Sequence, residues 1–246
     1  MSVLFLDIGN SHIKLAEKRG VAWKVLYRTT NGNVEQLQKI VAEQGGAEFI
    51  VISSVREDVL TRALKSLVEF DIKVLTTSLV DPDNLDYETP DTLGMDRFLT
   101  CYGAVSATNK DVICVDAGTA CTVDWMTAEG VYRGGVIMPG LTLFHKSIEA
   151  YLPELPAVEY NIPDQWPGRS TVKSLEWGTS GSFLMAIDGF IRKYLDGIAG
   201  ETELFITGGD SLYLSQNLNT ELKPVHRPYL HFDGMEKFWE DLENLK

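Results

Sequence analysis

Two short segments of the chain place an aspartate, a glycine and small polar residues directly after an apolar run. Phe5–Ser11 and Cys114–Ala120 share the pattern apolar–apolar–Asp–apolar–Gly–polar–small. A glycine after a strand lets the backbone approach a phosphate closely, because no Cβ intervenes, and N–H donors then face the oxygens. Either segment alone is more simply a turn whose Asp satisfies the backbone. Two copies in matching contexts favour a pair of phosphate-binding loops.

A third segment, Gly94-Met95-Asp96-Arg97, follows a polar loop that contains Pro and several Asp. On local grounds Asp96 stabilises the first turn of a helix and Arg97 is its partner. The position of this segment between the two halves of the chain suggests a second role for Asp96. A carboxylate there can accept the proton of a hydroxyl that attacks phosphorus, acting late and mainly orienting the nucleophile. Asp96 is therefore the candidate base.

Composition excludes several classes of protein. The net charge of −13 over 246 residues disfavours nucleic acid and anionic membranes as partners, and a nucleotide site must supply its own positive potential. The three cysteines match no zinc pattern and the four histidines form no metal-binding pair, so we expect reduced core thiols in a cytosolic protein. The N-terminal apolar run is too short for a signal peptide, and no run approaches a membrane span. A cytoplasmic location follows.

The elements that must position these residues form an internal repeat. Each Asp-x-Gly segment lies between two predicted strands, and a turn at Gly20 or Gly130 leads to a third strand. Helical spacing predicts helices over residues 34–44 (ending at Gly45-Gly46), 58–70, 96–107, 141–151, 172–198 and 235–245, and further strands over residues 49–55, 72–75 and 203–207. A repeat offset of 109 residues predicts a duplicated α/β fold with domains at 1–108 and 109–246 and a cleft between them.

These motifs resemble a known superfamily. Asp7–Ser11 and Asp116–Thr122 are similar to the two phosphate motifs of the acetate kinase/sugar kinase/Hsp70/actin superfamily, and Thr207-Gly208-Gly209 is similar to its adenosine-side motif. The resemblance implies two ribonuclease-H-like (actin-like ATPase) domains with a nucleotide cleft between them. Such motifs indicate the fold better than the substrate.

Further segments narrow the resemblance to the type III pantothenate kinases. Gly94–Arg97 with Tyr87 upstream, Gly134–Gly140, Ala150–Pro153 and Gly168–Val172 are similar in order and spacing to signatures of that family. The match runs from residue 4 to about 210, with Ser11 where Thr is usual and Cys121 where a hydroxyl or small residue is usual.

The resemblance implies an activity and a set of site residues. ATP would phosphorylate pantothenate with Asp96 as base, using Mg²⁺ on the nucleotide and a monovalent cation (K⁺ or NH₄⁺) at Asp116. The nucleotide would contact Asp7, Ile8, Gly9, Asn10, Ser11, His12, Ile13, Lys14 and Thr119. Pantothenate would contact Tyr87, Gly94, Met95, Asp96, Arg97 and Thr171.

A homodimer with a shared pantothenate pocket is also implied. Thr171, expected to be a helix N-cap as well as a ligand contact, opens a stretch with more apolar surface than one helical face needs. Its apolar residues are Leu175, Trp177, Phe183, Leu184, Ile187, Phe190 and Ile191.

Simpler readings remain open for several positions. Lys14 alternates out of a strand and is also explained as a solvated face, Tyr87 as a half-buried loop aromatic, and the tail from Tyr229 to Trp239 as packing. Two other functions also fit. A sugar or small-acid kinase of the superfamily would keep the Asp-x-Gly pair, and a non-catalytic accessory member would have lost turnover.

Overall fold

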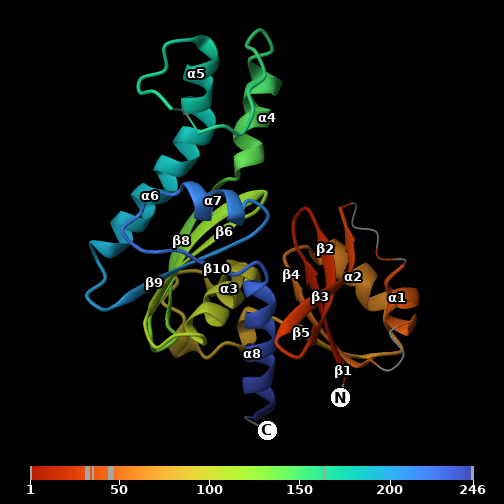
Figure 1. Cartoon of the computed structure of the whole chain (residues 1–246). Coiled ribbons are helices and arrows are strands. Elements are labelled where there is room, and N and C mark those ends of the chain that lie inside the picture. The colour runs from red at the N-terminus through yellow and green to blue at the C-terminus, as the bar shows by residue number, and fades with distance from the viewer. Residues whose placement is uncertain (1, 31–33, 35, 44–46, 163, 245–246) are drawn as a thin grey trace. The chain divides into compact units, whose positions relative to one another are not determined.

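The computed structural model describes residues 2–30, 34, 36–43, 47–162 and 164–244. It contains two compact units, Met1–Ala107 together with Tyr229–Lys246, and Thr108–Pro228 (Figure 1). Within the described ranges, every helix is too short or too polar to span a bilayer. Cys101, Cys114 and Cys121 are buried free thiols, as predicted.

The first unit is a five-stranded sheet with helices on both faces. Its elements are β1 (Ser2–Ile8), β2 (Ile13–Arg19), β3 (Ala22–Thr29), α1 (Leu37–Glu43), β4 (Ala47–Ser54), α2 (Glu57–Ser66), β5 (Asp71–Leu75), the 3-10 turns η1 (Thr77–Leu79), η2 (Pro82–Asn84) and η3 (Pro90–Thr92), α3 (Met95–Val105), and α8 (Leu230–Asn244). The strand order is β3-β2-β1-β4-β5. The first three strands are antiparallel neighbours, whereas β1, β4 and β5 run parallel.

Alternation along β1 assigns its side chains to two cores. Leu4, Leu6 and Ile8 join the apolar cluster that α1 and α2 cover. Phe5 faces the other way and packs edge-on against Trp23 and Trp239, the latter from α8. Asp7 has the same parity as Phe5, so it lies on the face that α8 covers.

The second unit repeats this plan. Its elements are β6 (Asp111–Ala117), β7 (Ala120–Met126), β8 (Tyr132–Pro139), α4 (Leu141–Tyr151), α5 (Thr171–Glu176), the π-helical turn η4 (Trp177–Gly181), α6 (Ser182–Leu195), β9 (Thr202–Thr207), α7 (Ser211–Asn217) and β10 (Val225–His226). The order β10-β9-β6-β7-β8 matches that of the first sheet strand for strand. Gly20 and Gly130 take positive φ angles of 62° and 85° at the equivalent hairpin turns. The predicted duplication is confirmed.

The end of the chain departs from the predicted domain limits. The range 109–246 placed the last segment in the second half, whereas Tyr229–Lys246 belongs to the first unit. The reason is aromatic packing of α8 on α3. The ring of Phe238 lies 5.6 Å from that of Phe98 and 5.4 Å from that of Tyr102. The tail packs as expected, but against the first unit.

Other differences are local. Residues 172–198 form α5 and α6 joined by η4 rather than one helix, α8 begins at Leu230 rather than 235, and α7 and β10 were not predicted. Three short 3-10 turns punctuate the predicted loop, two of them with Pro at the start, where its missing N–H leaves no bond unmade. The predicted helix end at Gly45-Gly46 lies outside the described residues.

Candidate active site

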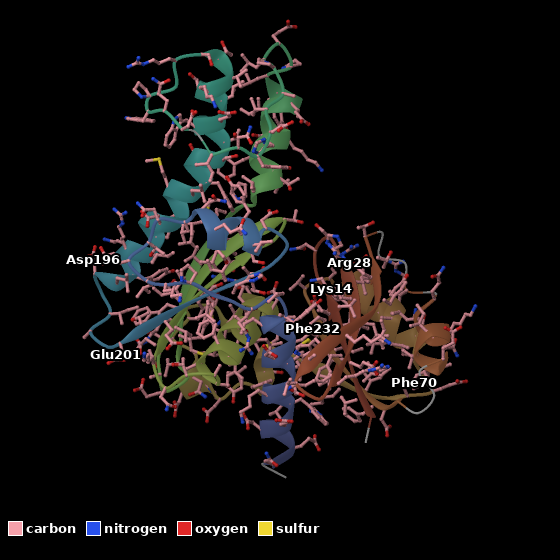
Figure 2. The ribbon with its side chains drawn as sticks, in the orientation of Figure 1. Lys14, Arg28, Phe70, Asp196, Glu201 and Phe232 are labelled. Carbon is pink, nitrogen blue, oxygen red and sulfur yellow. The ribbon has the colours of Figure 1, made fainter. Side chains whose placement is uncertain are left out.

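A row of polar side chains crosses the first sheet near the end of β1. Strand register pairs Asp7 with Ser53 on β4 and with Lys14 on β2, and pairs Lys14 with Arg28 on β3. Directly opposite residues share a face, so all four side chains lie on the face that α8 covers. Figure 2 labels Lys14 and Arg28 side by side. Like charges directly opposite one another repel, so this pair favours an anion beside it.

The turn between β1 and β2 has the close backbone approach that a phosphate loop requires. Gly9 N–H donates to the carbonyl oxygen of His12 at 2.9 Å, and a Cβ on Gly9 would lie 3.3 Å from that oxygen. Asn10 is exposed and Ser11 half-buried. Ile8 and Ile13 are buried in the core, so any contact they make with a nucleotide is through their backbone.

His12 makes a hydrogen bond with Arg28, the second cation of this row of polar side chains. Its Nε2 lies 3.0 Å from Nη2 of Arg28, and since a guanidinium only donates, the imidazole accepts. Burial lowers the pKa of His12, and the positive charges of Arg28 and Lys14 lower it further. His12 is therefore neutral and can accept a hydrogen bond from the Arg28 guanidinium. Sequence reading missed Arg28 because a β-bulge between Leu15 and Ala16 shifts the hairpin pairing by one residue.

Asp7 lies between two cations. Its Oδ2 is 3.7 Å from Nζ of Lys14, and its Oδ1 is 3.5 Å from Nε2 of His231 on α8. Burial alone would raise the pKa of Asp7, but His231 and Lys14 together hold it below its ordinary value. Lys14 is thus more than a solvated face, and His231 is a site residue that the sequence did not indicate.

The start of α3 brings the predicted base to the same unit. Gly94 is the N-cap residue, and Oδ1 of Asp96 accepts the backbone N–H of Arg97 at 2.9 Å. A Cβ on Gly94 would lie 2.5 Å from that Oδ1, so glycine is required for this arrangement. Asp96 also acts electrostatically on His231. Met95 and Arg97 are buried and Tyr87 is half-buried.

The second unit has the same loop with different neighbours. Asp116 pairs in register with Thr122 on β7 and Thr207 on β9, where the first unit has Lys14 and Ser53. Glycines enclose the carboxylate: a Cβ on Gly208 would lie 2.5 Å from its Oδ1, and one on Gly118 would lie 3.8 Å from it. Carboxylate and hydroxyl oxygens beside open backbone are suitable ligands for a hard cation. Thr119 at the loop tip is exposed.

The described residues contain no cluster of three or more His, Cys, Asp or Glu side chains that could hold a metal ion. In the second loop, burial and three nearby aspartates raise the pKa of the Cys121 thiol, so it stays protonated.

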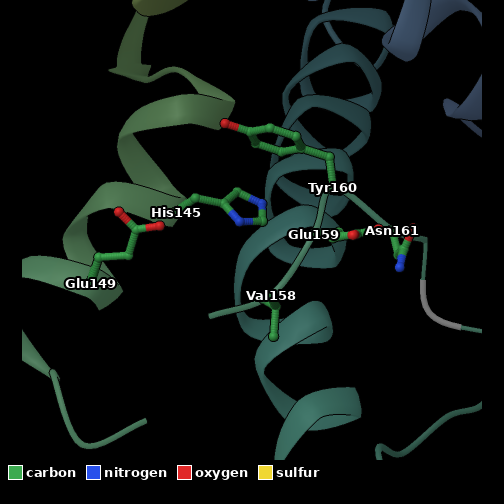
Figure 3. A pocket seen from close by; sticks show the side chains of 6 residues that line it. All are labelled: His145, Glu149, Val158, Glu159, Tyr160 and Asn161. Carbon is green, nitrogen blue, oxygen red and sulfur yellow. The ribbon is translucent and has the colours of Figure 1, made fainter. Parts of the chain in front are cut away.

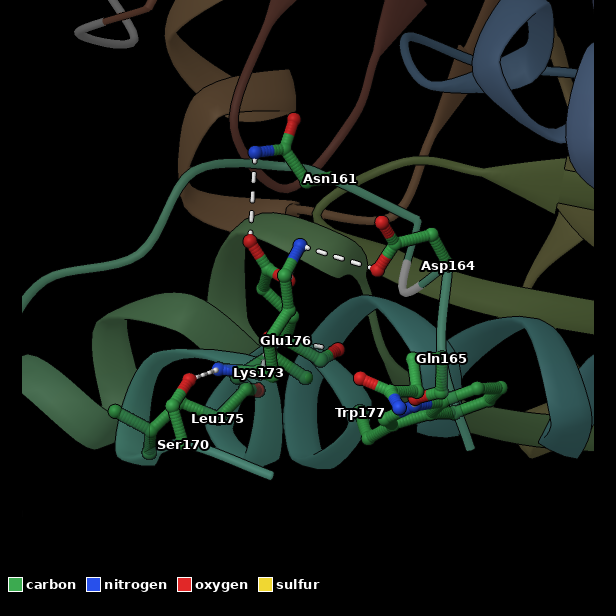
Figure 4. A network of polar contacts seen from close by, with 9 residues as sticks. Asn161, Asp164, Gln165, Ser170, Lys173, Leu175, Glu176 and Trp177 are labelled. Atoms are coloured by element: carbon green, nitrogen blue, oxygen red, sulfur yellow. Dashed lines mark hydrogen bonds and ion pairs between the residues drawn. The ribbon is translucent and has the colours of Figure 1, made fainter. Parts of the chain in front are cut away.

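Thr171 belongs to the second unit, at the start of α5. Ser170, not Thr171, caps α5, because its Oγ accepts the N–H of Lys173 at 3.2 Å. Thr171 is the first helical residue and is exposed. Figure 4 shows how the preceding loop is tied to this helix: Lys173 pairs with Asp164 at 3.4 Å, and Nδ2 of Asn161 donates to Oε1 of Glu176 at 3.5 Å.

A hollow of about 480 Å³ lies beside α4 in the same unit (Figure 3). The rings of His145 and Tyr160 meet edge-on there at 4.3 Å, and Nε2 of His145 lies 3.2 Å from Oγ of Ser180. Burial lowers the pKa of His145. The hollow contains no phosphate-loop residue.

Comparison with known proteins decides the family. A sequence model of the type III pantothenate kinases matches residues 3–193. The chain belongs to this family. It is 31% identical over 239 residues to the type III pantothenate kinase of Chlorobaculum parvum, covering 87% of this chain and 86% of that protein. With the corresponding enzyme of Flavobacterium johnsoniae the identity is 28% over 222 residues, with 89% and 91% covered. The chain is therefore a kinase.

Solved structures support the fold. A protein from Campylobacter jejuni assigned to the Baf family of transcriptional activators matches with a TM-score of 0.65 at 24% identity, covering 98% of this chain and 99% of that one. A ROK family glucokinase from Streptomyces griseus matches with a TM-score of 0.53 at 12% identity, with 96% and 98% covered. The duplicated actin-like fold of this type III pantothenate kinase family member is thereby confirmed.

Proposed function

We propose that this kinase transfers the γ-phosphoryl group of ATP to pantothenate, giving ADP and 4′-phosphopantothenate, the first step toward coenzyme A. The observation that carries the proposal is the start of α3, where Asp96 and buried Arg97 follow an N-cap glycine in the unit that holds Asp7 and Lys14. The segment lies within residues 3–193, which match the family model, and it resembles the Gly-x-Asp-Arg motif described in the sequence analysis.

The chemistry follows from the residues. Asp96 orients the pantothenate hydroxyl and accepts its proton as the oxygen bonds to the γ-phosphorus, while the bond from that phosphorus to the bridging oxygen breaks and ADP leaves. Asp96 is suited to this because its Oδ1 is held by the N–H of Arg97, which aims the carboxylate. Mg²⁺ bound with the nucleotide would supply positive charge that stabilises the transferred phosphoryl group.

The two Asp-x-Gly loops would bind the nucleotide phosphates through backbone N–H groups. Lys14 and Arg28 lie beside the first loop. Because the net charge of the protein is negative, binding of the nucleotide phosphates requires this local positive charge. Thr119 at the tip of the second loop would contact the nucleotide.

A monovalent cation, K⁺ or NH₄⁺, would lie at Asp116. In the first loop a lysine stands in register with the aspartate, whereas in the second the register partners are threonines. The hydroxyl and carboxylate oxygens would bind a cation. That cation would supply the positive charge that Lys14 supplies in the first loop.

Pantothenate would contact Tyr87, Gly94, Met95 and Arg97 of one chain and Thr171 of a second copy. Arg97 would face the substrate carboxylate or the transferred phosphoryl group, and buried Met95 would contribute through its backbone.

The apolar surface that we propose for a dimer differs from the one that the sequence predicted. Phe183, Leu184, Ile187 and Ile191 are buried in the core of the second unit and leave no exposed face. Other large apolar side chains of α4, the loop after it, α5 and α6 are exposed instead: Tyr151 (83%), Leu152, Ile162, Trp166 (72%), Val172 and Met185. This apolar exposure in the segments before and after Thr171 supports a second copy as the partner.

A coupled ADP-release assay with pantothenate and a panel of sugars and small acids tests the function. Among the acceptors tested, we expect only pantothenate to give turnover. Turnover with a sugar instead would indicate another kinase of the superfamily. The absence of turnover with every acceptor, despite ATP binding, would indicate a non-catalytic accessory protein.

A further inference from the structure

His231 is the second residue of α8 and the only part of that helix with a recorded ion pair to a phosphate-loop residue among the described positions. It lies 3.5 Å from Oδ1 of Asp7, while Lys14 lies 3.7 Å from Oδ2. Each oxygen of the carboxylate thus has its own cation, and the two cations come from opposite ends of the sequence.

Packing does not explain a histidine at this position. Both ring nitrogens are buried and neither makes a well-formed hydrogen bond, since 3.5 Å is an ion-pair distance. Its neighbour Phe232 is a buried apolar residue, and an apolar side chain at 231 would bury no unsatisfied nitrogen. A positive charge in the first turn of a helix also opposes the helix dipole. Packing and helix electrostatics therefore both disfavour a histidine at this position.

The groups that face His231 explain its charge. Burial and Lys14 on β2 act to lower the pKa of His231, but Asp7 on β1 and Asp96 on α3 outweigh them and raise it. The imidazole is thus ion-paired with the carboxylate of the phosphate loop, and the carboxylate of the candidate base also favours its charged form.

We propose that His231 is a positioning residue of the phosphoryl-transfer site, which binds one oxygen of Asp7 from α8 and so leaves Lys14 available to the nucleotide phosphates. The inference rests on the proposed function. Without His231, Lys14 is the cation left beside Asp7, and the ion pair between them competes with the nucleotide. The C-terminal helix is then part of the catalytic unit rather than a packing element alone.

The test measures binding of a non-hydrolysable ATP analogue with Mg²⁺ by calorimetry, with steady-state kinetics beside it. His231→Gln and His231→Leu should weaken analogue binding about tenfold, within the usual range for coupled neighbours. The KM for pantothenate should change less than the analogue affinity, because the ion pair with Asp7 is on the nucleotide side. Equal analogue affinity in wild type and in the folded His231→Gln protein would overturn the proposal.

A double-mutant cycle separates positioning from a general effect on the fold. In an Asp7→Asn background, where no carboxylate charge remains to be shared, His231→Gln should change analogue affinity little further. Additive losses would show that His231 does not act through Asp7 and would overturn the proposal.

Glu236→Gln is the matched control. Glu236 is on α8 and forms an ion pair with Lys18 of β2, so its removal loosens the same helix away from Asp7. Analogue affinity should be retained. An equal loss in this variant would assign the effect to loosening of α8. Failure of the wild-type chain to bind the analogue at all would instead reject the proposed function.

Discussion

Asp7 and Asp116 end equivalent strands of the two units, yet their surroundings differ in charge. Asp7 is paired with Lys14 and His231, whereas the register partners of Asp116 are threonines. The two loops therefore share a fold but differ in local charge, since one lies beside two cations and the other beside threonines. Asp96, at the start of α3, is the carboxylate proposed as the base.

Replacing the base tests the division of roles. Asp96→Asn keeps the side-chain shape and the acceptor for the Arg97 N–H but cannot take a proton. Turnover should fall by about two or more orders of magnitude, while ATP-analogue affinity stays near wild type. Single-turnover kinetics and calorimetry measure the two quantities. A variant with near wild-type kcat would remove Asp96 from the mechanism.

The ion at Asp116 is tested by exchanging salts. Activity should fall steeply when K⁺ is replaced by Na⁺ at constant Mg²⁺ and ionic strength, because the smaller ion fits the same oxygens poorly. Asp116→Asn should weaken the dependence on K⁺. Equal rates in the two salts would contradict the assignment.

The Asp7–His231 pair predicts how stability varies with pH. The pKa of Asp7 is lowered from 3.8, so its contribution is present above that value and is lost as pH falls through the folded pKa. The pKa of His231 is raised from 6.5, so its contribution is present below that value and is lost as pH rises through the folded pKa. Urea unfolding should show a larger stability difference between wild type and His231→Gln at pH 6 than at pH 9. A difference that does not depend on pH would contradict an ionic pair.

Among the elements, the crossing of α3 and α8 decides whether the site is assembled. The two helices meet at glycines: a Cβ on Gly103 would lie 2.6 Å from the carbonyl oxygen of Leu230, and one on Gly234 would lie 1.8 Å from that of Leu99. Close approach at these points holds Asp96 and His231, one at the start of each helix, on the same face of the sheet.

Gly234→Ala should therefore destabilise the protein by about 1–3 kcal/mol through overpacking, lowering the melting temperature by several degrees. Gly189→Ala on α6 is the control, because a Cβ there meets nothing within 4 Å and helix propensity should make it neutral or stabilising. Calorimetric melting of both variants measures this. Equal melting temperatures for the two variants would show that α3 and α8 tolerate separation.

At the scale of the whole molecule, Thr171 is exposed in the second unit, and so are several large apolar side chains of α4, the loop after it, α5 and α6. These side chains would be covered by a second copy of the chain. Light scattering should accordingly give twice the mass of one chain.

Mixing two inactive variants tests whether the pocket is shared. Asp96→Asn chains and Thr171→Ala chains, exchanged together, should recover activity, because one of the two pockets in each heterodimer is then intact. Each variant mixed with itself is the control. If mixing restores nothing, or if the protein is a monomer, the shared pocket is discarded while the kinase assignment stands.

The sequence by itself determined the repeated strand–turn–strand units, the two Asp-x-Gly loops, the helix that opens at Gly94 and the family. Each of these depends on residues that are close together in the sequence, because the alternation of apolar residues and the residue preferences of turns are local properties. The neighbours of Asp7 were decided only by the tertiary structure. A β-bulge shifts the register of the β2–β3 hairpin, so Arg28 lies opposite Lys14. Parallel pairing of β4 with β1 places Ser53 opposite Asp7.

His231 depends on the longest-range contact of all. It lies more than 220 residues from Asp7 in the chain, in a tail whose composition indicated only packing. That tail joins the first unit because its aromatic face fits α3, and because glycines on both helices allow their backbones to meet. Neither condition is visible in a local pattern, since complementarity between two helix surfaces exists only once both have folded.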